Sequence, residues 1–279
     1  MVARSGILLS LVFMLAASAP AGSSRASTQL VPDERGVIMY DYGAKTGIVY
    51  NPIVVGLEGA RYYHDYQATG NLESRVKFVN TADWFVEHAV DKGNYSLWEY
   101  SFDWPHYEGF SSPYSSALAQ ARGIDVLIKA YDETGDETYL QVARKAFGAF
   151  MVEYDEGGVV SKEGEDSVFL QILAKPGAPK TYVLNSHTKS LLLIKEYYEY
   201  THDYRAMLVF GKGMNWLTEN LGRYDAGDWS YYDLVGTKAS KSYHSGQTKQ
   251  ISQLYDATGE LVLKDYHTRF KGYESRIGL

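Results

Sequence analysis

Apolar and small residues recur at helical spacing through most of the chain, and four short, similar segments interrupt this pattern. Before the second segment, for example, Ala117, Ala121 and Ile124 would lie on one face of a helix. Each segment has a tyrosine followed three residues later by a threonine. In three of them glycine comes next, which is typical of a helix that ends, and the polar residue after it suits the start of another helix. The segments are 66–71, 131–136, 198–203 and 255–260.

This repetition predicts a helical hairpin that is used four times, because the four threonines lie 65, 67 and 57 residues apart. We therefore expect a mainly α fold, an incomplete (α/α) toroid of about four helical hairpins over residues 50–279. An open solenoid or an irregular bundle is the alternative. The expected helices span 52–67, 71–91, 113–133, 136–153, 187–200, 203–220, 247–256 and 260–273.

Three long connections, 92–112, 154–186 and 221–246, are not plainly helical. Connections of this length in a compact domain are usually functional. The second contains GVVSK and SVFLQIL and the third contains WSYYDL, and these segments suggest short strands. We expect small β-ribbons over one mouth of the toroid, where a concave surface favours a ligand site.

The first 26 residues have the layout of a secretory signal peptide. Arg4 precedes a mostly apolar run, and small residues follow. The run is shorter than the roughly 20 residues that a membrane span needs, although an uncleaved anchor is an alternative. We therefore expect an exported protein, periplasmic or secreted, with no stable membrane span after cleavage. Residues 27–49 would form an N-terminal extension.

The composition of the chain excludes several kinds of catalytic and binding site. The 279-residue chain has no cysteine, which excludes disulfides, zinc–thiolate sites and a cysteine nucleophile. Its formal net charge of −7 argues against general nucleic-acid binding. The motifs of serine hydrolases, zinc proteases, phosphate loops and dinucleotide-binding proteins are absent from the sequence. We expect no cofactor and no metal site.

Lysine is concentrated in two stretches without acidic residues, 174–189 and 235–250. If these stretches converge, they would form a cationic mouth on an acidic protein. Two solvated surface loops are the alternative. A third segment, 98–114, is rich in aromatic residues, which suit sugar rings that bear carboxylates but also close the ends of helical toroids. Together these features favour an acidic polymer as the partner, with tyrosine as the candidate acid or base.

Several segments resemble the D-glucuronyl C5-epimerase family, which acts on heparosan and heparan-type polysaccharide chains. The match is strongest near the C-terminus, in RYDAGDWSYYDL, SYH and QISQLYDATGE. The resemblance implies the catalytic domain of a compact, bacterial-type member, with an incomplete α/α toroid, and related dimeric enzymes suggest a homodimer. The matching segments keep their order over about 40–275 and include PYSSALAQARGIDVLIKAY at 113–131, TADWFVEHA at 81–89, YVLNS at 182–186 and YNPIVVGLEGARYYHDY at 50–66.

The resemblance implies that a proton is removed from C5 of a uronic acid and then returned. This proton is weakly acidic, so cations or hydrogen-bond donors must stabilise the enediolate, and an acid–base pair must straddle the ring. By matching motifs, Tyr232 and Tyr243 would be the catalytic tyrosines. The pKa of a free tyrosine is about 10, and Lys238 and Lys241 would favour the phenolate. The expected substrate-binding residues are Asn185, His187, Lys238, Lys241, His244, Tyr50, Trp104 and Tyr114.

Two positions depart from the family's pattern. Ala174-Lys175-Pro176 stands where the family usually has Glu-Tyr-Pro, and Val235 stands where an arginine commonly follows the YDL motif. Lys175 would then act as a catalytic base, with its pKa lowered by burial and by other lysines, or it would bind the uronate carboxylate. A changed substrate or a lost activity is the third interpretation.

We therefore expect a C5-epimerase that acts on uronic acid residues, of the D-glucuronyl to L-iduronyl type, in an acidic polysaccharide. A uronate polysaccharide lyase shares the proton abstraction but then expels the C4 substituent. An unsaturated-uronyl hydrolase would need a carboxylate such as Asp83 or Asp125 in the cleft. A non-catalytic polysaccharide-binding protein would bind the polymer without exchange or cleavage.

Overall fold

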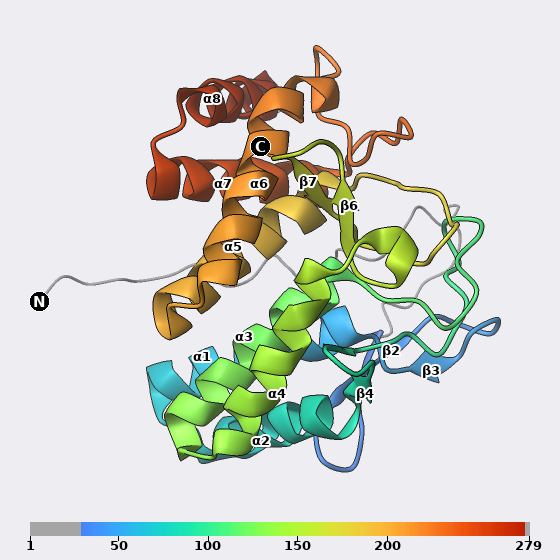
Figure 1. Cartoon of the computed structure of the whole chain (residues 1–279), viewed down its shortest axis with the longest axis vertical. Coiled ribbons are helices and arrows are strands. Elements are labelled where there is room, and N and C mark those ends of the chain that lie inside the picture. Colours follow the sequence, from blue (N-terminus) through green and yellow to red (C-terminus); the bar gives the residue numbers. More distant parts are fainter. Residues whose placement is uncertain (1–28, 277–279) are drawn as a thin grey trace, which may run out of the picture.

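The computed structural model describes residues 29–276, and helices that follow one another as hairpins dominate its architecture (Figure 1). Consecutive helices pack as α1 with α2, α3 with α4, α5 with α6, and α7 with α8. The prediction of a mainly α fold of four helical hairpins is confirmed. The helices are α1 (Pro52–Thr69), α2 (Leu72–Glu87), α3 (Ala117–Thr134), α4 (Glu137–Phe147), α5 (Leu184–Thr201), α6 (Tyr204–Asn220), α7 (Lys241–Thr258) and α8 (Leu261–Arg276).

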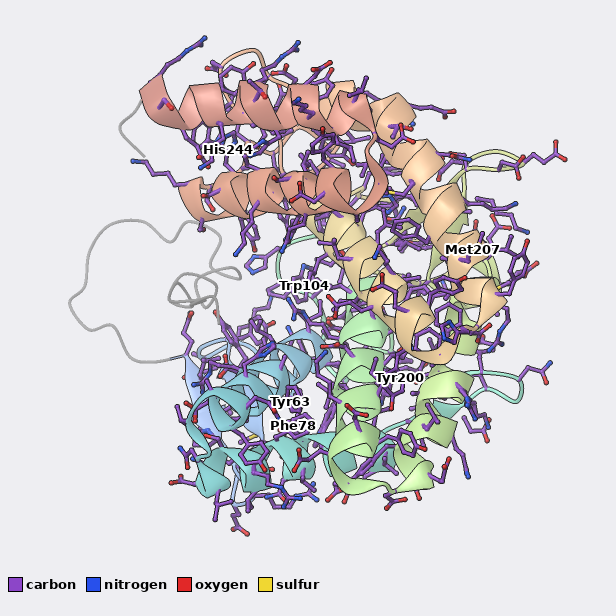
Figure 2. All side chains as sticks on the ribbon, turned by 90° about the vertical axis from the view of Figure 1, so that its left-hand side faces the viewer. Tyr63, Phe78, Trp104, Tyr200, Met207 and His244 are labelled. Atoms are coloured by element: carbon purple, nitrogen blue, oxygen red, sulfur yellow. The ribbon has the colours of Figure 1, made fainter. Side chains whose placement is uncertain are left out.

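The first helices of the hairpins form the inner wall of an open ring. Helix α1 packs on α3, α3 on α5, and α5 on α7. Among the described residues, no comparable packing joins α7 back to α1. Figure 2 shows the α1–α2 hairpin and the α7–α8 hairpin at opposite ends of this open arc. The fold is therefore an incomplete (α/α) toroid.

The repeated threonine has the same structural role in all four hairpins. Its hydroxyl donates to a carbonyl oxygen four residues earlier, as Thr134 does to Ala130 at 2.7 Å. The same oxygen accepts the backbone N–H of the residue two positions later, as from Asp136 at 3.2 Å. The hydroxyl thus adds a second bond to a carbonyl in the last turns of one helix and pairs the backbone N–H that comes just before the following helix. Thr69, Thr201 and Thr258 make the same pair of bonds.

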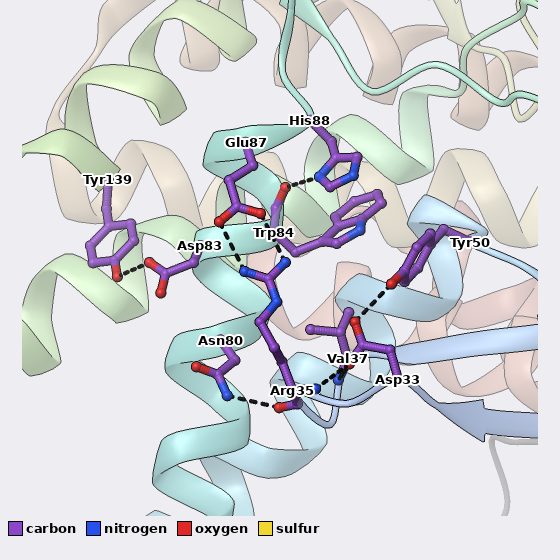
Figure 3. Close-up of polar contacts among 10 residues, drawn as sticks. All are labelled: Asp33, Arg35, Val37, Tyr50, Asn80, Asp83, Trp84, Glu87, His88 and Tyr139. Carbon is purple, nitrogen blue, oxygen red and sulfur yellow. Dashed lines mark hydrogen bonds and ion pairs between the residues drawn. The ribbon is translucent and has the colours of Figure 1, made fainter.

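The N-terminal extension, for which no elements were predicted, forms a three-stranded antiparallel sheet. Its strands are β1 (Leu30–Pro32), β2 (Ile38–Asp41) and β3 (Ile48–Val49). Arg35 donates to both carboxylate oxygens of Glu87 on α2 at 2.9 and 2.8 Å, and the Asn80 amide donates to the Arg35 carbonyl at 2.7 Å (Figure 3). These bonds hold the sheet against α2.

Two short β-ribbons lie in the long connections. Strand β4 (Val90–Asp91) pairs with β5 (Ser96–Leu97), and β6 (Val160–Lys162) pairs with β7 (Val168–Leu170). The ribbon expected in the second connection is confirmed. The strand expected in WSYYDL is wrong, because this segment makes only isolated bridges, such as Tyr231 with Lys238. The Asp233 carboxylate accepts backbone N–H groups two and four residues later, which turns the chain instead of extending it.

Two helices begin earlier than predicted. Helix α5 begins at Leu184 and not at 187, and α7 begins at Lys241 and not at 247. The Ser240 hydroxyl accepts the Tyr243 N–H at 3.3 Å and so caps α7. Asn185 and Tyr243 therefore lie in the first turns of helices and not in loops.

The expected signal peptide, 1–26, lies outside the described residues. Within residues 29–276, none of the helices combines the length and the apolar character that crossing a bilayer requires.

Candidate functional site

A cavity opens on the inner face of the ring, and all four inner helices contribute to its wall. The N-terminal sheet and the connection before α7 complete the wall. Most lining atoms are apolar, but the wall also contains charged groups and tyrosines. The lining residues are Leu30, Tyr40, Ile53, Val54, Leu57, Glu58, Leu118, Arg122, Ile172, Asn185, Lys189, Tyr232, Tyr243 and Gln250.

Tyr232 and Tyr243 are in contact on this wall. Their ring centroids lie 4.5 Å apart and the ring planes are tilted by 48°. The Tyr232 N–H donates to the Thr237 carbonyl at 2.7 Å, and its carbonyl accepts the Leu184 N–H at 3.0 Å. Tyr232 is thus tied to the start of α5, while Tyr243 belongs to the first turn of α7. The structure brings the two tyrosines together, and their catalytic role remains a prediction.

The two tyrosines differ in how easily they ionise. Burial raises the pKa of Tyr243 to about 12, although the neighbouring Tyr232 hydroxyl favours its phenolate. Burial, together with the neighbouring Tyr243, raises the pKa of Tyr232 well above its usual value. Tyr243 is therefore the first of the pair to lose a proton. Lys238 and Lys241 do not favour this ionisation as expected, because neither lines the cavity and Lys238 pairs with Asp228 at 2.8 Å.

A buried carboxylate holds the turn that carries Tyr232. Asp233 is fully buried, and one of its oxygens accepts the N–H groups of Val235 and Thr237 at 3.1 and 2.9 Å. Its other oxygen accepts the Tyr107 hydroxyl at 2.7 Å. The bond from Tyr107 links the first long connection to the third, and the two backbone bonds fix the turn within the third.

Replacing Asp233 by alanine is expected to lower the free energy of unfolding by about 2–3 kcal/mol, because hydrogen bonds to a charged group are lost and buried donors are left unpaired. Urea unfolding followed by circular dichroism measures this change. Asp228→Ala is the matched control, because Asp228 is exposed and its one ion pair within residues 29–276 is with exposed Lys238. Equal stabilities of the two variants would contradict the role given to Asp233.

Two cations line the cavity without an anionic partner. Arg122 on α3 is 8% exposed, and its Nε has no hydrogen-bond partner among the described residues. Burial lowers the pKa of Arg122 to about 10. Burial, and then the charge of Arg122, also lower the pKa of Lys189 on α5. Neither side chain forms an ion pair within residues 29–276, although the charges of Asp125 and Glu196 favour the protonated form of both.

The nearby carboxylates are already engaged. Glu58 lines the cavity but pairs with Arg61 at 2.6 Å. Asp125 pairs with Lys129, which also lies 3.8 Å from Glu196. Asn185 adds an amide oxygen that has no hydrogen-bond partner among the described residues. The cavity therefore presents positive charge and an unsatisfied amide to a ligand.

Both histidines proposed from the sequence are structural. His187 is fully buried, its Nδ1 accepts the Leu170 N–H at 3.1 Å, and its Nε2 donates to the Gly213 carbonyl at 3.0 Å. Burial lowers the pKa of His187 to about 3, so the ring is neutral near pH 7. The ring of His244 stacks on the ring of Trp229 with centroids 3.6 Å apart, and its Nε2 donates to the Phe270 carbonyl at 3.1 Å. Neither ring lines the cavity.

The structure places four other candidates outside the cavity wall. The Lys175 ammonium donates to the carbonyl and the hydroxyl of Ser111, both at 2.7 Å. The Tyr50 hydroxyl donates to Asp33 at 2.7 Å, on the side that faces α2 (Figure 3). Trp104 and Tyr114 belong to an aromatic cluster of the first connection, in which Tyr114 stacks on Tyr100 with ring centroids 4.6 Å apart.

Arg122 belongs to none of the site motifs predicted from the sequence, and Lys189 was predicted only as one lysine of an acid-free stretch. A signal for Arg122 was available. It is an arginine between Ala121 and Gly123 in the stretch 117–128, whose other residues are mostly apolar or small, and such a helical stretch is buried on most sides.

The fold recurs in solved structures, which define this chain as an (α/α) toroid of the kind that sugar-converting enzymes use. A cellobiose 2-epimerase from Spirochaeta thermophila superposes with a TM-score of 0.58 at 12% identity, covering 81% of this chain and 58% of the other. A D-mannose isomerase superposes with a TM-score of 0.57 at 13% identity, and the match covers 88% of this chain and 66% of the isomerase. An unsaturated glucuronyl hydrolase from Streptococcus agalactiae superposes with a TM-score of 0.53 at 20% identity, and the match covers 78% of this chain and 56% of the hydrolase. At these identities the likeness establishes the fold alone.

The model of the D-glucuronyl C5-epimerase C-terminus family matches residues 92–272. The chain belongs to this family. An uncharacterized protein of Methanocaldococcus jannaschii is 32% identical over 187 residues, which cover 65% of this chain and 60% of that protein. The D-glucuronyl C5-epimerase of Caenorhabditis elegans is 28% identical over 215 residues, or 70% of this chain and 34% of that enzyme. The chain thus spans only part of each relative.

Proposed function

We propose that the protein is a C5-epimerase of uronic acid residues, of the D-glucuronyl to L-iduronyl type, in an acidic polysaccharide. The observation that carries the proposal is the contact between Tyr232 and Tyr243 on a cavity wall, within the region that matches the epimerase family. A proton-transfer pair inside a cationic cavity suits a reaction whose substrate is a carboxylate.

In this proposal Tyr243 and Tyr232 act as one unit. Tyr243 ionises first, and its phenolate takes the C5 proton while the Tyr232 hydroxyl stabilises the phenolate. The electron pair of the broken C–H bond moves into the carboxyl group and forms an enediolate. The fixed charge of Arg122 stabilises the added negative charge, because a preorganised cation in a low-dielectric site acts strongly on charge that develops there.

The engaged carboxylates weigh against a hydrolase. Hydrolysis of a glycosidic bond commonly uses two carboxyl groups that flank it. Of the described residues that line the cavity, Glu58 alone carries a carboxylate, and it is paired with Arg61. Of the two candidates from the sequence, Asp83 accepts the Tyr139 hydroxyl at 2.6 Å and Asp125 pairs with Lys129, and neither lines the cavity.

The experiment is incubation of the protein in D₂O with heparosan and with a β-1,4-linked glucuronic acid polymer, followed by NMR. We expect deuterium at C5 and the appearance of the C5-inverted residue. Ultraviolet absorbance of an unsaturated uronate would instead identify a lyase. Binding of these polymers without exchange or cleavage would identify a non-catalytic protein and overturn the proposal.

A further inference from the structure

Inversion at C5 needs a second proton-transfer group on the opposite face of the sugar. Two groups that lie on opposite faces of a sugar ring must leave room between them for van der Waals contacts on both faces, a separation of about 7 Å. The rings of Tyr232 and Tyr243 are only 4.5 Å apart and the two hydroxyls interact. The pair therefore approaches a sugar from one side, and the group for the other side lies elsewhere on the wall.

Few described groups on the cavity wall can carry out this step. Glu58 is held by Arg61, and the Tyr40 hydroxyl donates to Gln29 at 2.5 Å. The guanidinium of Arg122 remains protonated near neutral pH, because its lowered pKa is still about 10. The one further titratable side chain among the described lining residues is Lys189, which has neither a hydrogen bond nor an ion pair within residues 29–276.

We propose that Lys189 is the acid–base group that serves the face of the sugar opposite Tyr243. This inference rests on the proposed function. Lys189 is on α5, one turn after Asn185, so the two side chains lie on the same helix face and line the same cavity. Tyr243 comes from α7, the neighbouring inner helix. The two proton-transfer groups are thus fixed on separate rigid elements.

The proton balance closes without any further reactant. When Tyr243 takes the C5 proton, the Lys189 ammonium gives its own proton to C5 of the enediolate from the other side. The sugar is inverted, and Lys189 is left as a neutral amine beside a neutral Tyr243. In the reverse direction the neutral amine removes the proton and Tyr243 returns one. Proton exchange with solvent resets both groups between turnovers.

The surroundings of Lys189 favour this exchange. The charge of Arg122 disfavours a second positive charge on Lys189, whereas the charges of Glu196 and Asp125 favour it. Both acids are also neighbours of Lys129. Burial has the largest effect, and it lowers the pKa of Lys189. A lysine in such surroundings changes its protonation state more readily than an exposed one.

The test is a comparison of exchange and inversion in D₂O for Lys189→Gln. Losing a proton donor is expected to slow inversion about 10²–10⁴-fold. Exchange at C5 of one epimer, which Tyr243 catalyses alone, should continue within about tenfold of the wild-type rate and yield deuterated residues of unchanged configuration. A merely structural role of Lys189 would lower exchange and inversion together. Lys195→Gln is the matched control, because Lys195 lies on the same helix and pairs with Glu199.

The outcomes are distinguishable. Inversion at the wild-type rate in Lys189→Gln would overturn the inference and leave the proposed function intact, as would equal loss of exchange at both epimers. Loss of inversion in Lys175→Gln but not in Lys189→Gln would assign the second group to Lys175 instead. No exchange with wild-type protein on either polymer would count against the proposed function itself. Circular dichroism of each variant checks that it is folded.

Discussion

Tyr243→Phe is expected to slow inversion at C5 by about 10²–10⁴-fold, because phenylalanine keeps the ring but removes the group that carries the proton. The ring packs against Tyr232, so the fold should be unchanged. The measurement is the rate of deuterated, inverted product by NMR. Near-wild-type inversion in Tyr243→Phe would exclude this tyrosine as the base.

The pH dependence of the wild type and of Tyr232→Phe completes this test. With the pKa of Tyr243 at about 12, the phenolate fraction, and with it the rate, should rise about tenfold per pH unit from neutral pH upwards, until Lys189, whose pKa is lowered by burial, loses the proton that it donates. Tyr232→Phe removes the hydroxyl that favours the phenolate, so its profile should move to higher pH. A flat profile for the wild type between neutral and alkaline pH would contradict the assignment of a phenolate base.

The helical framework followed from the sequence because each hairpin carries its own local signals. The threonine hydroxyls bond to groups at the helix ends that lie within six residues in the chain. The spacing of apolar residues indicates which face of each helix is buried. The helix starts at Leu184 and Lys241 were missed because the first turns, LNSH and KSYH, are mostly polar and show no apolar residues at helical spacing. The N-terminal sheet was missed because its strands have only two to four residues.

Residues of the candidate site could be predicted from the sequence only where they belong to a motif of the family. Tyr232 and Tyr243 were found by resemblance and do meet in the cavity. Lys175 was chosen because it stands where the family usually has Glu-Tyr-Pro, and Lys238 by local charge, but Lys175 bonds to Ser111 and Lys238 pairs with Asp228. Whether a lysine is paired depends on contacts between distant segments, which sequence spacing does not encode. Arg122 was overlooked because its role depends on a ring of helices, not on its neighbours in the chain.

The unpaired charge of Arg122 leads to an expected trade-off between stability and function. Arg122→Met removes a buried cation and retains a flexible side chain of similar length. Folding lowers the pKa of Arg122 from 12.5 to about 10. Below pH 10 the arginine is therefore charged in both the unfolded and the folded state, and the folded state bears the full free-energy cost of burying the charged guanidinium. We expect the free energy of unfolding at pH 7 to increase by about 1–3 kcal/mol.

The same substitution is expected to lower the rate of C5 inversion about 10²–10³-fold, because the cation that stabilises the enediolate is gone. Thermal unfolding and the D₂O exchange assay measure the two effects on one preparation. Arg144→Met, at an exposed position on α4, is the matched control and should change neither quantity. A destabilised Arg122→Met protein with full activity would show that this arginine supports the packing of α3 and not the reaction. A more stable, inactive variant would instead show that the unpaired charge is retained for catalysis, since folding alone gains nothing from it.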